Sequence, residues 1–250
     1  MLRVKLVANA GLLLQYDGVT LLLDCIYGSE EHAFSDVSPA VWQKMLQGEP
    51  PFEQIDYLLF SHAHPDHFSA EKTLTYLEHR PVKGVFFPES PETFNFSAEL
   101  TRRGIPCGAL SAQYDRAAFR FTPNLSVRAI HTHHLDKRFE DVEHLCYLLK
   151  CGEKHVLFTA DLDYVTERLE QLKDLPLHGV FINPLFFSVL RRGKFFRGDL
   201  QAKYFCIYHV PFAEDDHLDM RRILARDLEQ WDKARGQALA LTEPEQEIIL

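Results

Sequence analysis

Three histidines and an aspartate lie within six consecutive positions in the first third of the chain. They are His62, His64, Asp66 and His67, in the pattern H-x-H-x-D-H. Imidazole nitrogens and carboxylate oxygens are ligands that zinc and related transition metals take from proteins. A histidine-rich affinity tag would lie at a terminus and would not alternate with alanine, proline and aspartate. The spacing therefore predicts a metal-binding loop.

The elements before this motif predict how it is positioned. The motif follows an apolar run at 57–60, which is typical of a short buried strand. Polar residues after such a strand lie on a loop held by a rigid scaffold, where chemistry concentrates. Three later candidates end apolar runs in the same way, namely His134 after 125–130, Asp161 after 156–160 and His209 after 204–208.

The order of these residues resembles the signature of the metallo-β-lactamase-fold hydrolases, over about residues 4 to 212. The segments 9–11 and 208–212 look most like a cytoplasmic, lactonase-like branch of that family. The resemblance implies one domain over residues 1–250, with the α/β fold of a four-layer αββα sandwich. Interleaved strands and helices along the chain agree with two packed sheets covered by helices.

The resemblance also implies a binuclear metal site, with zinc expected first and manganese or iron as alternatives. Two ions about 3.5–4 Å apart would lower the pKa of a bound water toward about 7, which gives a hydroxide nucleophile. Asp66 would serve both as a ligand and as the group that orients this hydroxide and accepts its proton. The implied ligands are His62, His64 and His134 for one ion, Asp66, His67 and His209 for the other, and Asp161 as a bridge.

The third histidine of the first ion has competitors. His131, His133 and His134 all follow the same strand, and the family's strand-end pattern favours His134 if His131 replaces a proline. His144 precedes the next predicted strand. It fits a half-buried structural histidine, or a catalytic proton donor to the leaving group, which is the role we assign to it here.

Two positions beside the predicted ligands add detail. The dipeptide Asp17-Gly18 predicts a hairpin, because a primed turn needs positive φ, and the second strand of that hairpin ends at Asp24. The family places an aspartate there, close to the metals. Ala160 stands where the family often has glycine. Because alanine reaches positive φ only with strain, we expect the turn before Asp161 to differ.

The identity of His64 bears on the type of reaction. Iron-dependent relatives that reduce oxygen or nitric oxide usually carry glutamate at this position and a fused flavodoxin-like module. We therefore predict a binuclear metal-dependent hydrolase acting on a small ester, lactone or phosphoester. The alternatives are a mononuclear iron oxidoreductase or dioxygenase of the same fold, and a metal-binding protein without catalysis.

Composition limits the partners and the compartment. The net charge of −9 gives no global attraction for nucleic acid, so no nucleic-acid partner is expected. No apolar run is long enough to cross a membrane. The five cysteines form no C-x-x-C pair and the first residues lack the pattern of a secretory signal, which favours a cytoplasmic location.

The substrate is expected to be a small molecule that can carry an anionic group. The basic residues Arg191, Arg192, Lys194 and Arg197 suit phosphate or carboxylate, although a solvated basic loop is the favoured interpretation. Candidates for an apolar wall are Phe34, Phe186, Phe187, Phe195 and Phe196. The long connection 25–54 is expected to line the site, and residues 216–234 to form a final amphipathic helix.

Overall fold

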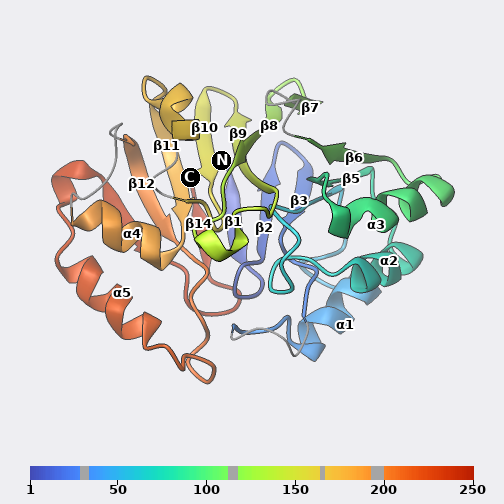
Figure 1. Ribbon diagram of the computed structural model, residues 1–250, viewed down its shortest axis with the longest axis horizontal. Coiled ribbons are helices and arrows are strands. Elements are labelled where there is room, and N and C mark those ends of the chain that lie inside the picture. Colours follow the sequence, from blue (N-terminus) through green and yellow to red (C-terminus); the bar gives the residue numbers. More distant parts are fainter. Residues whose placement is uncertain (29–33, 112–117, 164–166, 193–199) are drawn as a thin grey trace.

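The computed structural model describes residues 1–28, 34–111, 118–163, 167–192 and 200–250. Two seven-stranded sheets lie face to face, with α1, α2 and α3 outside one sheet and α4 and α5 outside the other (Figure 1). This arrangement confirms the predicted four-layer αββα sandwich. Within the described ranges, no helix combines the length and the apolar character that a membrane span requires.

The first sheet has the strand order β14-β1-β2-β3-β4-β5-β6. Strands β1 to β3 are antiparallel neighbours, whereas β3 to β6 are parallel. Asp17 and Gly18 both have positive φ, at 53° and 76°, which confirms the predicted primed hairpin turn. The elements of this half are β1 (Arg3–Leu6), β2 (Leu12–Tyr16), β3 (Val19–Leu23), α1 (Pro39–Gln47), β4 (Tyr57–Leu59), α2 (Ala70–His79), β5 (Gly84–Pro88), α3 (Pro91–Arg102), β6 (Cys107–Leu110) and β14 (Glu247–Ile249).

The second sheet has the strand order β13-β12-β11-β10-β9-β8-β7, in which β10 to β13 are parallel. Its parallel strands therefore end at one edge of the sheet, as those of the first sheet do. The elements of this half are β7 (Ala118–Thr122), β8 (Leu125–Thr132), η2 (Lys137–Phe139), β9 (His144–Cys151), β10 (Lys154–Phe158), η3 (Glu167–Leu172), β11 (Leu177–Ile182), α4 (Pro184–Arg191), β12 (Ala202–Ile207), α5 (Met220–Glu229), η4 (Lys233–Arg235) and β13 (Gln237–Ala240).

The main core lies between the sheets. Alternate residues of each strand point inward, for example Val4, Leu12 and Leu14 from the first sheet and Val127 and Leu149 from the second. These side chains are buried almost completely. Apolar burial of this kind supplies most of the favourable free energy of folding, so the packed sheets form a rigid base for the loops at their edge.

The final helix is shorter than the sequence predicts. The expected helix over 216–234 is wrong at both ends, since α5 covers only Met220–Glu229. The Asp216 carboxylate accepts hydrogen bonds from the backbone N–H groups of Met220 (2.8 Å) and Arg221 (2.9 Å), and so caps the first turn from outside the helix. After the helix, the indole N–H of Trp231 donates to the carbonyl of Gly236 at 2.8 Å, which fixes a turn there.

The turn before Asp161 also departs from expectation. Ala160 has a φ of 46°, so it adopts the left-handed backbone that glycine usually provides, and the expected change of turn is wrong. Two side chains hold this conformation. The Ala160 N–H donates to Tyr208 Oη at 3.2 Å, and Asn183 Nδ2 donates to the Ala160 carbonyl at 3.1 Å. The surrounding structure therefore imposes the turn on an unfavourable residue.

Substitution of Ala160 by glycine is expected to stabilise the protein. Relief of the left-handed strain, about 1–2 kcal/mol, exceeds the added entropy cost of glycine, about 0.5–1 kcal/mol. The free energy of unfolding should therefore rise by up to about 1.5 kcal/mol, measured by urea denaturation. A clear decrease for Ala160→Gly would show that this turn is not strained.

Candidate metal centre

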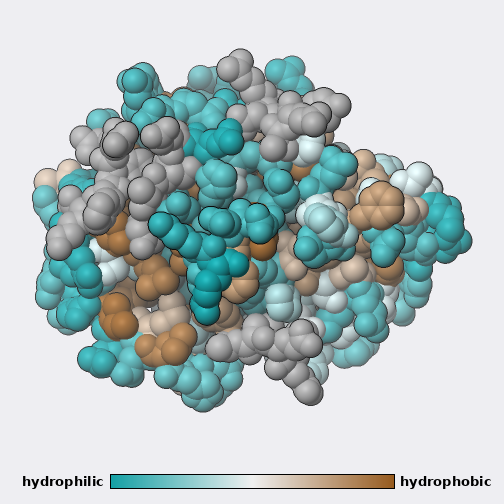
Figure 2. All heavy atoms as spheres, in the orientation of Figure 1, coloured by the Kyte–Doolittle hydropathy of each residue, from teal (hydrophilic) through white to brown (hydrophobic). Residues whose placement is uncertain are grey.

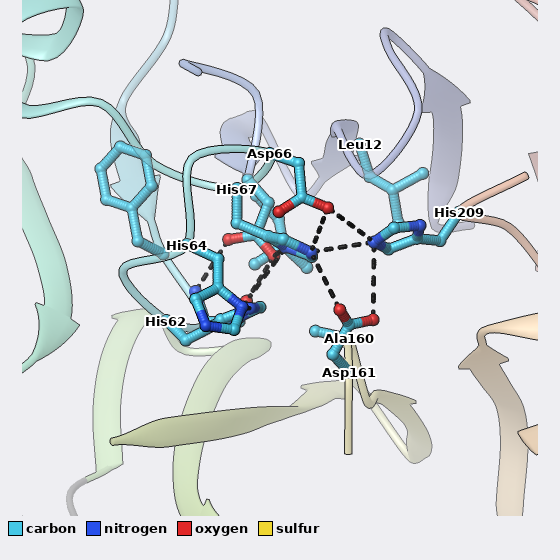
Figure 3. Close-up of polar contacts among 12 residues, drawn as sticks. Leu12, His62, His64, Asp66, His67, Ala160, Asp161 and His209 are labelled. Carbon is cyan, nitrogen blue, oxygen red and sulfur yellow. Dashed lines mark hydrogen bonds and ion pairs between the residues drawn. The ribbon is translucent and has the colours of Figure 1, made fainter. Parts of the chain in front are cut away.

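The residues predicted as ligands converge at the edge where the strands end. Two groups of ligand atoms form, and within each group all ligand atoms lie within 4.8 Å of one another. Figure 3 shows side chains from the two halves pointing toward one another at this place. The first group is His62, His64 and His134, and the second is Asp66, His67, Asp161 and His209.

The fold explains why residues so distant in sequence meet. The H-x-H-x-D-H loop follows β4, while Asp161 follows β10 and His209 follows β12. The segment after β8 pairs with the Asp161 segment through an isolated bridge between His134 and Leu162. In addition, the Leu135 N–H donates to the Asp161 carbonyl at 2.8 Å.

This pairing distinguishes His134 from its competitors. His134 is buried and belongs to the first ligand group, whereas His133 is exposed. His131 is buried and its Nδ1 lies 3.4 Å from a Glu143 carboxylate oxygen, outside both groups. The alternation of side chains along an extended segment accounts for the difference between positions 133 and 134.

The first group offers neutral imidazoles. His62 Nε2 and His64 Nδ1 lie 3.1 Å apart. Burial, together with the nearby His67 and His144, holds the pKa of His62 well below its usual range. Burial and the neighbouring His134 lower the pKa of His64 to about 4. Both rings are therefore neutral at pH 7, the form in which histidine binds metals.

The second group is rich in negative charge. His67 Nε2 and His209 Nε2 are 2.9 Å apart, and His209 Nε2 lies 3.5 Å from both Asp66 Oδ2 and Asp161 Oδ1 (Figure 3). Burial alone would raise the pKa of Asp66, but His67 and His209 hold it at about 2. Burial would likewise lower the pKa of His67, yet Asp66, Asp161 and Asp24 hold it well above its usual range. The buried carboxylates therefore favour a positive charge close to them. A divalent cation can supply this charge in place of a proton.

Asp161 faces both groups. Its Oδ2 lies 3.6 Å from His134 Nε2 and 3.5 Å from His67 Nε2, while its Oδ1 lies 3.5 Å from His209 Nε2. His134 Nε2 is buried and has no hydrogen-bond partner, while its Nδ1 accepts from the Asp136 N–H at 3.1 Å. Neutral imidazoles and ionised carboxylates with unused donor atoms fit a pair of divalent ions with Asp161 between them.

The ligand loop is held from beneath by Asp24, which is fully buried. Its carboxylate accepts hydrogen bonds from the Ser61 N–H (2.7 Å) and the Ser61 hydroxyl (2.6 Å), and it lies 3.0 Å from His67 Nδ1. Because the Ser61 hydroxyl donates to Asp24, it accepts at 2.9 Å from His62 Nδ1. Both imidazoles are thereby turned with Nε2 toward the ligand groups. The sequence places Asp24 near the ligands but gives Ser61 no role.

His144 has no access to the pocket in this structure. Its side chain is fully buried, its Nδ1 lies 2.7 Å from Thr132 Oγ1, and its ring centroid lies 5.1 Å from that of His62. Burial holds the pKa of His144 well below its usual range. The ring is absent from the described lining of the pocket. This position does not support the predicted role as proton donor and favours a packing role behind His62.

Only some of the residues predicted to contact the substrate line the pocket. Phe34, from the long connection 25–54, lines the pocket and lies edge-on to His209 with ring centroids 4.9 Å apart, as expected of that connection. Phe186 and Phe187 instead pack in the core between the second sheet and its helices. Arg191 Nε lies 2.9 Å from the buried Asp227 carboxylate and so joins α4 to α5. Lys194, Phe195, Phe196 and Arg197 lie outside the described residues.

Asn9 is a partner of the centre that the sequence does not reveal. This fully buried residue places its Nδ2 2.9 Å from His209 Nδ1, and its Oδ1 has no partner. In that orientation Nδ2 donates to Nδ1, so the proton of a neutral His209 sits on Nε2, the atom that faces the ligand group. A half-turn of the amide lets Oδ1 accept from Nδ1–H, which frees Nε2 for a metal and satisfies the orphaned oxygen.

Replacement of Asn9 is therefore expected to weaken metal binding. Asn9→Leu, which has the same branched shape, should lower zinc affinity about 10–100-fold, because His209 loses the acceptor that fixes its tautomer. Asn9→Asp should retain affinity, since a carboxylate accepts the same hydrogen bond. Competition with a chromophoric chelator measures both variants, with melting temperatures as the control for folding. Equal affinity of Asn9→Leu and the unaltered protein would contradict this role.

Comparison with known proteins places the geometry in a family. Residues 20–182, more than half of the 250-residue chain, match the model of the beta-lactamase superfamily domain. No curated protein matches the sequence. The diiron β-hydroxylase CmlA from Streptomyces venezuelae has a TM-score of 0.64 and 19% identity over 100% of this chain, which spans 54% of that protein, or about half its length.

Two other solved structures match over nearly their full lengths. The metallo-β-lactamase-fold protein YhfI from Bacillus subtilis has a TM-score of 0.61 and 16% identity, covering 99% of this chain and 98% of that one. A possible metal-dependent hydrolase from Veillonella parvula has a TM-score of 0.64 and 13% identity, covering 100% of both chains. At such identities these likenesses show the fold alone. With the family match across 20–182, the fold and the ordered ligand residues, the chain belongs to the beta-lactamase superfamily, with the metallo-β-lactamase fold.

Proposed function

We propose that this protein is a metal-dependent hydrolase that binds two divalent ions, zinc first among them, and cleaves a small ester, lactone or phosphoester. The observation that carries the proposal is the Asp161 carboxylate, which faces both ligand groups where they open onto a pocket. A site with protein ligands on one side and open space on the other is typical of catalytic rather than structural metals.

Bound divalent ions supply Lewis acidity and lower the pKa of water toward about 7. The residues of the chain hold and orient the reactants. His62, His64 and His134 would hold one ion, while Asp66, His67 and His209 would hold the other, with Asp161 shared between them.

Asp66 is the described carboxylate best placed to orient an attacking water. It lines the pocket, and His67 and His209 keep it ionised by holding its pKa at about 2 against the effect of burial. An ionised carboxylate accepts a hydrogen bond from water and directs the oxygen lone pair toward the substrate. Nearby imidazoles fix its position, since His209 Nε2 lies 3.5 Å and His67 Nε2 3.7 Å from Asp66 Oδ2.

An iron oxidoreductase is the second candidate, and one observation favours it. The similar structure of CmlA is described as a diiron β-hydroxylase, so the fold also supports iron chemistry. Against it stands the possible metal-dependent hydrolase from Veillonella parvula, which matches over its whole length. His64 in the first ligand group also favours hydrolysis, as the resemblance of the motif implies.

Metal removal is expected to abolish hydrolysis. After treatment with a chelator, turnover of a panel of esters, lactones and phosphodiesters should fall at least about 10²-fold, and added zinc or manganese should restore it. Asp161→Ala should lose activity to the same degree, while Asp174→Ala, at an exposed position, serves as the matched control. Metal-free protein with full activity would overturn the proposal. Iron-dependent oxygen consumption without hydrolysis would establish the second candidate.

A further inference from the structure

A pocket of about 620 Å³ opens onto both ligand groups. This volume suits a small organic molecule that buries most of its surface. A substrate must place the bond that is broken near the ligands, so its remaining part lies along the other walls. The ligands that line the pocket are His64, Asp66, His134, Asp161 and His209.

The remaining described walls are mostly apolar. Of the fifteen described lining residues, five are ligands, seven have apolar side chains and three are polar. The apolar residues are Phe34, Pro65, Leu135, Phe139, Pro184, Leu185 and Met220.

The three polar residues are already engaged with protein groups. Asn183 accepts from the Phe186 N–H at 2.8 Å as the cap of α4, and donates to the Ala160 carbonyl. Arg138 is the one lysine or arginine in the described lining. Its guanidinium makes a paired contact with the Asp136 carboxylate at 2.6–3.2 Å. The described part of this wall therefore provides no uncompensated positive charge for an anionic substituent.

Apolar surface also continues from the pocket to its mouth. The ring centroid of Phe139 lies 4.6 Å from that of His64 and 5.4 Å from that of His134, and the residue is 40% exposed. Leu185, at the start of α4, is 47% exposed. Figure 2 shows apolar side chains gathered on this face over α4 and α5. An apolar group bound in the pocket would cover the exposed parts of Phe139 and Leu185 and gain their burial.

We infer that the substrate is an uncharged ester or lactone whose acyl part is an extended apolar chain or ring, bound between Phe139 and Leu185. This inference rests on the proposed hydrolase function. The oxygen of water bonds to the carbonyl carbon and the bond from that carbon to the alcohol oxygen breaks. One proton of the water goes to the alcohol oxygen, so an ester gives a carboxylic acid and an alcohol, and a lactone gives a single hydroxy acid.

A series of p-nitrophenyl esters with straight acyl chains of increasing length tests the inference. Each added methylene should raise kcat/KM on the order of fourfold until the pocket is filled, because burial of a methylene contributes that factor. An ester with an acyl chain of equal length that ends in a carboxylate should not show this increase in kcat/KM. A flat profile, or a preference for the carboxylate-ended ester, would overturn the inference.

Two matched variants assign the effect to the pocket. Phe139→Ser should flatten the dependence on chain length, while Phe94→Ser should leave it unchanged, since Phe94 is 72% exposed on α3 and outside the described lining. If both variants keep the unaltered slope, the acyl chain binds elsewhere and the inference is wrong.

A binding measurement separates this inference from the proposed function. The uncharged fluorescent amine N-phenyl-1-naphthylamine should bind the zinc-loaded protein, and decanol should displace it. Phe139→Ser should weaken this binding several-fold, and Phe94→Ser should not. Probe binding without metal-dependent hydrolysis of any ester, lactone or phosphoester would refute the proposed function while supporting the apolar pocket. Metal-dependent hydrolysis with no such binding and no chain-length effect would refute the inference alone.

Discussion

The centre depends on one buried carboxylate, that of Asp24. A fully buried ion is costly unless charge and hydrogen bonds compensate it, and here Ser61 and His67 provide that compensation. The interaction joins the end of β3 to the loop after β4, so the loop cannot move independently of the first sheet. The second sheet also fixes the start of this loop. Tyr147 Oη donates to the Phe60 carbonyl at 2.8 Å, and the Leu145 N–H donates to the Ser61 carbonyl at 2.8 Å.

Backbone strain gathers where the strands reach the centre. Asp24, Ala160 and His209 follow β3, β10 and β12, and each non-glycine residue has a positive φ, at 51°, 46° and 61°. Such conformations persist only when the surrounding structure imposes them. The two packed sheets supply that support, and the sharp turns direct side chains from both halves into one small volume.

Much of the centre could be predicted from sequence because its ligands follow apolar runs. Strand ends at one sheet edge place their polar residues together, and the resemblance to the metallo-β-lactamase family implied how these residues divide between two ions. The partner of His209 could not be found in this way. Asn9 lies 200 positions away in sequence, and neither residue type nor spacing marks it as a neighbour.

The remaining differences arise from tertiary packing. Phe186 and Phe187 are fully buried in the core while the adjacent Leu185 lines the pocket, because the orientation of α4 decides which side chains face each way. Ala160 adopts a glycine-like turn because Tyr208 and Asn183 bind its backbone, a constraint that local propensity does not contain. The extent of α5 depends on the Asp216 carboxylate, which caps the helix from four residues before Met220.

The claim that the two ligand groups each bind a metal is tested most directly by elemental analysis after zinc reconstitution and removal of free metal. The unaltered protein should contain two zinc ions per chain. His209→Asn, whose asparagine tolerates the left-handed backbone at that position, should contain one. A single ion in the unaltered protein, or two tightly held ions in His209→Asn, would contradict the account.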